Sequence, residues 1–145
     1  RWESQPPSYY GRPMKSRNWL ALPVLAAALV GSAYAHHSFA ATYFEDKTEK
    51  IQGKLVQFLY RNPHSFVHVE VKNADGSMTR WAVEWGAGGQ LGRQGVTRDT
   101  LKPGDEVVIN GNPGRNPEDH RLRMVNIVRP PANGQPEFKW GGTFD

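Results

Sequence analysis

Two runs, Ser65-Phe-Val-His-Val-Glu-Val71 and Met78-Thr-Arg-Trp-Ala-Val-Glu-Trp85, decide the fold of this chain. Apolar and polar residues alternate in both runs, which is typical of β-strands with one buried face. The short connection Asn73–Ser77 between them contains Asp75-Gly76, a pair that favours a tight turn. We therefore expect a β-hairpin over 65–85.

The register of this hairpin can be argued from its side chains. A two-residue turn would set Trp81 opposite Glu70. A three-residue loop with Gly76 in the left-handed conformation sets Trp81 opposite Val69, and Arg80 opposite Glu70. Only the second register gives one apolar face together with an opposite-charge pair, so we expect it.

The expected register assigns a role to each side of the hairpin. The core face holds Val67, Val69, Val71, Trp81, Val83 and Trp85. The outer face holds Phe66, His68, Glu70, Arg80, Ala82 and Glu84.

The rest of the chain supplies three more strand patterns and one glycine-rich segment. Ile51–Tyr60 precedes the hairpin, with Gly53 predicting a bulge or a tight bend. After the hairpin come the glycine-rich residues 86–95, and then the strand patterns of 106–110 and 121–128. This order predicts an all-β fold, a small five-stranded OB-like Greek-key barrel with one short helical turn between strands three and four. A small β-sandwich or an open roll is the alternative.

The N-terminal part reads as an export signal. Met14-Lys-Ser-Arg17 resembles a translation start with basic residues, Trp19–Gly31 is apolar, and Ala33-Tyr-Ala35 resembles a cleavage site. The apolar run of about 13 residues is shorter than the about 20 that span a bilayer. We predict upstream sequence over 1–13, a signal peptide over 14–35, the OB-like domain over 36–129 and a flexible tail over 130–145.

Cleavage after Ala35 changes what the composition implies. Four of the 18 basic residues and one of the 14 acidic residues precede His36, which leaves 14 basic and 13 acidic residues. The near-neutral mature chain gives no electrostatic reason to expect nucleic acid as a partner. We predict a periplasmic or secreted protein with no stable membrane anchor after processing. The lack of cysteine excludes thiolate metal sites and thiol catalysis.

The same cleavage would place two histidines at the new N-terminus. His36 would offer an α-amine and an imidazole, a pair of nitrogen ligands suited to copper. His64, beside Pro63 at a strand entrance, is the expected partner within reach of the N-terminus. His68 lies about 13 Å further along an extended strand, which argues against one ion binding both. The metal hypothesis names His36, His37 and His64 as copper ligands; the alternative is that these histidines lie in solvent, as we expect for His120.

Two other functions compete with non-catalytic copper binding. The outer face around Phe66, His68 and Glu84 could bind a periplasmic protein, a peptide or a small ligand without any metal. A copper site built on an N-terminal histidine could also belong to a metal-dependent redox enzyme, but no substrate groove is marked in the sequence. For Glu84 we expect an ion pair rather than a catalytic role, and for Trp81 and Trp85 core packing rather than a stacking platform.

An ordered set of short motifs resembles a known protein family. The motifs are His36-His-Ser-Phe39, Asn62-Pro-His64, Trp81-x-x-Glu84, Leu91-x-Arg93-x-Gly95 and Leu101-Lys-Pro-Gly-Asp105. Together they resemble the small exported proteobacterial proteins of domain of unknown function family 6152, over about residues 36–128. The resemblance implies export and a small β fold, and it implies no activity. Val96 departs from the pattern, because we expect an aromatic residue there.

Overall fold

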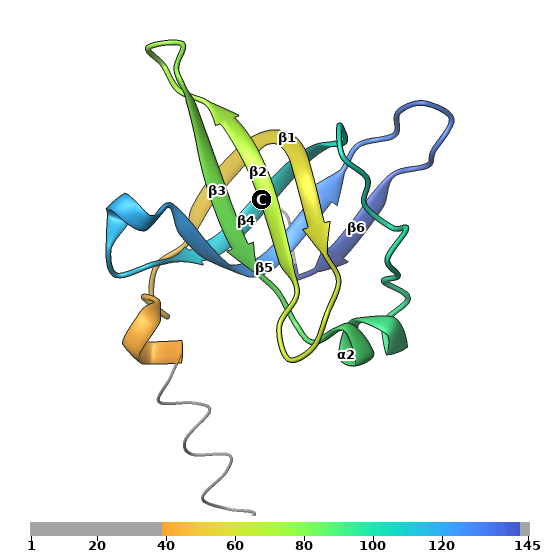
Figure 1. Cartoon of the computed structure of the whole chain (residues 1–145), viewed down its shortest axis with the longest axis horizontal. Coiled ribbons are helices and arrows are strands. Elements are labelled where there is room, and N and C mark those ends of the chain that lie inside the picture. The colour runs from red at the N-terminus through yellow and green to blue at the C-terminus, as the bar shows by residue number, and fades with distance from the viewer. Residues whose placement is uncertain (1–38, 143–145) are drawn as a thin grey trace, which may run out of the picture. The chain divides into compact units, whose positions relative to one another are not determined.

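The computed structural model describes residues 39–142, which form a strand-rich domain. The predicted upstream sequence and signal peptide, like His36 and His37, lie outside the described residues. The elements in chain order are β1 (Glu49–Leu59), β2 (Phe66–Lys72), β3 (Met78–Glu84), α2 (Gly88–Arg93), β4 (Glu106–Pro113), the 3-10 helix η1 (Pro117–Asp119), β5 (Arg121–Arg129) and β6 (Phe138–Gly141). Figure 1 shows how they are arranged.

The first five strands close into a barrel. The sheet runs in the order β3-β2-β1-β4-β5-β6, and a further pairing of β3 with β5 joins its two sides. That closing pair is parallel, with Val83 beside Leu122, whereas the other neighbours are antiparallel. Helix α2 follows β3 at one end of the barrel (Figure 1). The prediction of a five-stranded OB-like barrel with one helical turn between strands three and four is confirmed.

The register of the central hairpin is also confirmed. Val69 pairs with Trp81, and Glu70 pairs with Arg80. The Arg80 guanidinium donates to the Glu70 carboxylate at 2.9 Å. Gly76 has a φ of 86°, the left-handed conformation that a three-residue loop requires. Alternation of side chains was sufficient to choose between the two turns.

Strand β1 bends and pairs with two neighbouring strands. Its first half pairs with β4 and its second half with β2, with Lys54 in both ladders. Gly53 lies at this change of partner, where a Cβ atom would come within 2.1 Å of the carbonyl oxygen of Glu70. Glycine is needed here because the backbones of β1 and β2 approach too closely for a side chain.

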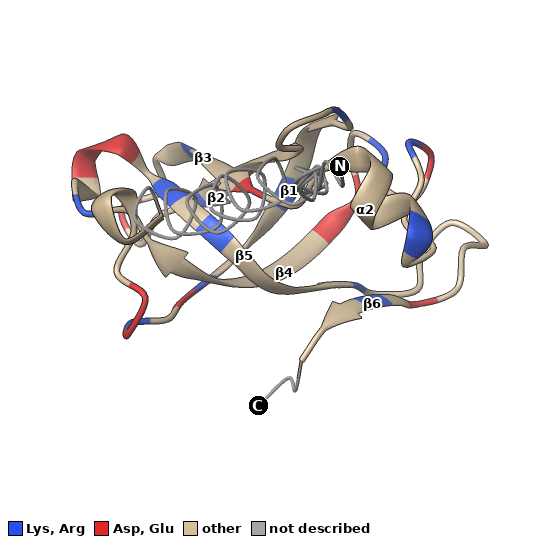
Figure 2. Ribbon diagram, turned by 90° about the horizontal axis from the view of Figure 1, so that it is seen from below, with Lys and Arg blue, Asp and Glu red and all other residues tan. Residues whose placement is uncertain are grey.

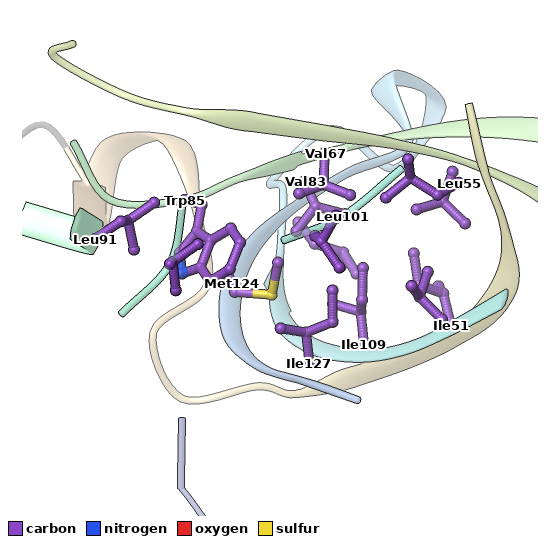
Figure 3. Close-up of a cluster of buried hydrophobic side chains, with 14 residues drawn as sticks. Ile51, Leu55, Val67, Val83, Trp85, Leu91, Leu101, Ile109, Met124 and Ile127 are labelled. Atoms are coloured by element: carbon purple, nitrogen blue, oxygen red, sulfur yellow. The ribbon is translucent and has the colours of Figure 1, made fainter. Parts of the chain in front are cut away.

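The barrel encloses one apolar core. Every barrel strand and α2 contribute buried side chains, and Figure 3 shows Trp85, Met124 and Leu91 together in one part of this cluster. Val67, Val69 and Val83 are fully buried, as the sequence predicts. Trp81 differs from the expectation, since it is only partly buried and packs against the margin of the core.

The C-terminal region differs from the predicted flexible tail. Phe138–Gly141 forms β6 and pairs with β5. Trp140 packs edge-to-face against Trp85, with ring centroids 5.0 Å apart. The buried Arg129 donates hydrogen bonds of 2.8 Å to the carbonyl groups of Thr100 and Pro136, which fixes the connection to β6. Proline and glycine in 130–137 mark a turn before this strand rather than the end of ordered structure.

Charged residues are distributed over several elements of the domain. Figure 2 shows basic bands along β5 and acidic residues on other strands and loops. Arg121, Arg123 and Arg129 supply the basic side chains of β5. Within residues 39–142, every helix is too short or too polar to cross a membrane.

Candidate functional site

His64 lies in the connection between β1 and β2, and this connection is tied to the end of β3. The buried Ser65 exchanges backbone hydrogen bonds with the two residues that follow β3: its N–H donates to the Gly86 carbonyl at 3.0 Å, and its carbonyl accepts from Trp85 N–H at 2.8 Å. The Ser65 hydroxyl also donates to the Arg61 carbonyl at 3.2 Å. These bonds hold His64 beside the last residues of β3.

Glu84, the last residue of β3, faces His64. Its Oε1 atom lies 3.2 Å from Nδ1 of His64, and its Oε2 atom lies 3.7 Å from the Arg121 guanidinium. The predicted ion-pair role is therefore confirmed. The environment differs from the expected outer face, because Glu84 is only 9% exposed.

Tyr43 covers Glu84 and explains this burial. The tyrosine is 1% exposed, and its hydroxyl donates to Oε2 of Glu84 at 2.6 Å. Burial raises the pKa of the Tyr43 hydroxyl well above its usual range, and the hydrogen bond to Glu84 adds to the shift. Tyr43 thus stays a neutral donor to a buried carboxylate throughout the physiological pH range.

The first described residue of the chain, Phe39, also lies against His64. The two rings meet edge-to-face with centroids 5.8 Å apart. The Arg123 guanidinium lies over the Phe39 ring at 3.9 Å and 3.6 Å from the Glu45 carboxylate. The lead-in to the barrel is therefore anchored beside His64.

These groups border a cavity of about 300 Å³. His64, Glu84 and Phe39 lie on its wall together with two indole rings, those of Trp85 and Trp140. We take this cavity and the His64–Glu84 pair as the candidate functional site.

The other predicted outer-face residues form a separate cluster. Phe66 and His68 stack with ring centroids 6.5 Å apart, and the Arg61 guanidinium lies 5.3 Å from the Phe66 ring. Burial lowers the pKa of His68, and the positive charges of Arg80 and Arg61 lower it further. His64 and His68 thus have different surroundings, in line with the sequence argument against a shared ion.

His120 also departs from its expected solvated position. It has a φ of 46° after η1, and its ring lies 5.3 Å from that of Trp81. The two rings border a second hollow of about 270 Å³ together with Pro113 and Pro117.

A complete metal site would need residues outside the described part. Within residues 39–142, no three His, Asp or Glu side chains are grouped so that they could hold a metal ion. His36 and His37, the other two predicted ligands, lie outside that range. Among the described residues, Nε2 of His64 has no hydrogen-bond or ionic partner.

Sequence reasoning missed two residues that hold the site. In the sequence, Tyr43 is one of several aromatic residues ahead of the first strand pattern, and Arg121 is the first residue of the strand pattern of 121–128. Neither carries a local signal that points to Glu84, because the three residues meet only when β3 pairs with β5 and the lead-in crosses them.

Comparison with known proteins gives a family and little beyond it. The model of the family described as "Family of unknown function (DUF6152)" matches residues 24–123. No match was found among curated proteins. Similar solved structures include two crystal structures of the mitochondrial single-stranded DNA binding protein Rim1 from S. cerevisiae, with TM-scores of 0.44 and 0.39 and identities of 13% and 14%. In both cases 58% of this chain and 93% of that chain are covered.

Proposed function

The chain belongs to the DUF6152 family of unknown function, and we propose from its own residues that it is an exported, non-catalytic binding protein for a copper-type metal. The ligands are His36, through its freed α-amine and imidazole, His64, and His37. Export, cleavage before His36 and a periplasmic or secreted location are parts of the proposal.

The observation that carries the proposal is the contact between Phe39 and His64. His36 precedes Phe39 by three residues, which span at most about 10 Å of extended chain. A mature N-terminus at His36 is therefore within reach of the His64 imidazole. The adjoining cavity of about 300 Å³ leaves space for an ion and its ligands.

The surroundings of His64 also suit a metal ligand. Histidine ligands usually donate their second ring N–H to a carboxylate or a carbonyl, which fixes the tautomer and the ring orientation. The Glu84 carboxylate faces Nδ1 at 3.2 Å and favours a proton there, which leaves the lone pair of Nε2 for a metal. The hydrogen bond from Tyr43 holds Glu84 in this position.

The donor set favours copper over other ions. Three imidazoles and an amine are nitrogen ligands, and the chain has no cysteine to favour a thiolate site. Nitrogen donors in a tetragonal arrangement suit Cu(II). Because the ligands must be deprotonated, copper affinity should fall as the pH drops through about 6.5, the usual histidine pKa.

The decisive experiment compares the mature protein with a variant that carries one extra glycine before His36. The extension keeps every side chain but moves the α-amine away from the His36 imidazole. We expect it to weaken copper binding about as much as His64→Ala, whereas His120→Ala, in a separate hollow, leaves binding unchanged. Equal copper affinity of the extended and unextended proteins would contradict the proposal. N-terminal sequencing of exported protein checks that cleavage precedes His36.

A metal-free interaction module is the second candidate, and the stack of Phe66, His68 and Arg61 favours it. This partly exposed cluster on β2 would serve a peptide or protein partner. Loss of partner capture in a Phe66→Ala variant, with copper binding absent from the wild type, would move this candidate to first place. Single-stranded DNA, the ligand named for Rim1, is a useful additional titrant, and the copper proposal expects no binding to it.

A further inference from the structure

The cavity beside His64 has the walls of a site for an aromatic ring. Trp85 and Trp140 meet edge-to-face within its lining, 5.0 Å apart, and Leu91 adds an aliphatic side chain. Its volume of about 300 Å³ lies at the lower end of the range of small-molecule pockets. A ligand the size of one substituted ring would fit this space.

One of these indole rings has an unused hydrogen-bond donor. Trp85 is only 4% exposed, and its Nε1–H is buried without a partner among the described residues. The corresponding N–H of Trp140 donates to Oε1 of Gln94 at 2.8 Å. An unpaired buried donor is costly, and native structures rarely leave one without a partner. The Trp85 ring lies on the cavity wall while its donor is covered by protein atoms, so a ligand must displace a covering group to pair with it.

The charges of the lining favour an anionic acceptor. Among the described residues, Glu84 is the only carboxylate on the wall, and both of its oxygens are engaged, one with His64 and one with Tyr43. Arg123 contributes a guanidinium whose only carboxylate partner among the described residues, Glu45, lies at 3.6 Å. The amide nitrogen of Gln94 adds another donor, since Trp140 uses its oxygen. The Arg123 guanidinium and the Gln94 amide thus give the wall donors for an anionic acceptor.

We propose that this cavity binds a small aromatic carboxylate, with the ring against Trp85 and Trp140 and the carboxylate oxygens accepting from the surrounding donors, Arg123 among them. The proposal goes beyond copper binding, because it needs neither His36 nor a metal. It also differs from the outer-face module, which uses β2.

The test uses trans-cinnamate and its neutral analogue cinnamamide as probes of the mature protein, with EDTA present to remove metal. Binding is followed by calorimetry and by tryptophan fluorescence. We expect saturable binding of cinnamate, about tenfold tighter than binding of cinnamamide, because a guanidinium strengthens hydrogen bonds to a carboxylate. Arg123→Gln should reduce this preference to about twofold or less. Arg80→Gln, which removes the same charge on the hairpin away from the cavity, should leave the preference unchanged.

A second comparison tests the aromatic wall. Trp140→Ala should weaken both probes by about tenfold, since it removes a ring that would contact the ligand. Trp81→Ala removes an indole from the other hollow and should leave both affinities unchanged. The glycine extension before His36 should not alter cinnamate binding, so failure of the copper proposal and failure of this one are distinguishable.

A measurement on the unmodified sequence avoids dependence on variant folding. Cinnamate should move the Nε1–H resonance of Trp85 in an ¹H–¹⁵N NMR spectrum, with smaller changes at Trp81. The proposal is overturned by an absence of saturable binding at millimolar concentrations, by equal affinity for the two probes, or by shifts confined to Trp81.

Discussion

The two sides of β3 teach different lessons about this fold. On the inward side, Val83 and Trp85, which directly follows the strand, are buried against apolar neighbours from several strands. On the outward side, Glu84 is almost equally buried, but its neighbours are a tyrosine hydroxyl, an imidazole and a guanidinium. Alternation in the sequence predicts which side a residue faces. It does not predict that another segment of the chain will cover the polar side.

Substitutions on the inward side of β3 should cause the largest loss of stability. Trp85→Ala removes a large buried ring and should lower the free energy of unfolding by about 3–5 kcal/mol. Trp81→Ala, at a partly buried position four residues earlier, should cost less, about 1–2 kcal/mol, because less apolar area leaves the core. Urea denaturation of both variants measures the difference. Equal losses would mean that both rings belong equally to the core.

Substitutions on the outward side of β3 should cause the next largest loss of stability. Glu84→Gln removes the charge that His64 and Arg121 face and should cost about 1–3 kcal/mol. Glu70→Gln is the matched control on the same side of the hairpin. Its ion pair with Arg80 is exposed, so the loss should stay below about 1 kcal/mol. If the two substitutions cost the same, the burial of Glu84 has no energetic role.

Tyr43→Phe separates the hydroxyl from the ring that covers Glu84. At neutral pH the variant should lose about 1–2 kcal/mol with the hydrogen bond. The pKa of Tyr43 is raised in the folded state, so the unfolded chain loses this proton first, near pH 10, and stability falls as the pH rises further. The variant lacks this component, so its stability should decline less steeply above about pH 10. Identical alkaline slopes would show that the hydroxyl is not shielded.

The smallest expected change in stability is that of a substitution at His68, whose pKa is lowered in the folded state. The unfolded chain therefore takes up this proton first, and stability should fall as the pH drops below about 6.5. His68→Gln removes that component, which should amount to less than about 1 kcal/mol. Unfolding curves of the variant and the wild type at neutral and mildly acidic pH check the direction. A larger acid loss in the variant would contradict it.

Much of the barrel could be predicted from local signals. The alternation of side chains and the pair Asp75-Gly76 are sufficient to predict the hairpin register. The order of the strand patterns is sufficient to predict the barrel. Strand β6 was missed because Phe138–Gly141 is short and follows a segment rich in proline and glycine. Its place depends on contacts of Trp140 with Trp85 and of Arg129 with the preceding turn, which no local pattern reveals.

The candidate site was predictable only in parts. His64 and Glu84 could each be singled out by residue type, but their contact arises because Ser65 ties the β1–β2 connection to the end of β3. Tyr43 and Arg121 reach Glu84 from 41 and 37 positions away in the sequence. Contacts of that range depend on how the barrel closes, so sequence periodicity carries no information about them.

We propose that the outward side of β3 prepares His64 to bind a metal through Nε2. Long-range ¹H–¹⁵N NMR of metal-free protein at mildly alkaline pH reads the tautomer directly. The account predicts a proton on Nδ1, facing Glu84, and an unprotonated Nε2, with the tautomer mixture shifting in Glu84→Gln. A proton on Nε2 in the wild type, or a tautomer unaffected by Glu84→Gln, would contradict it.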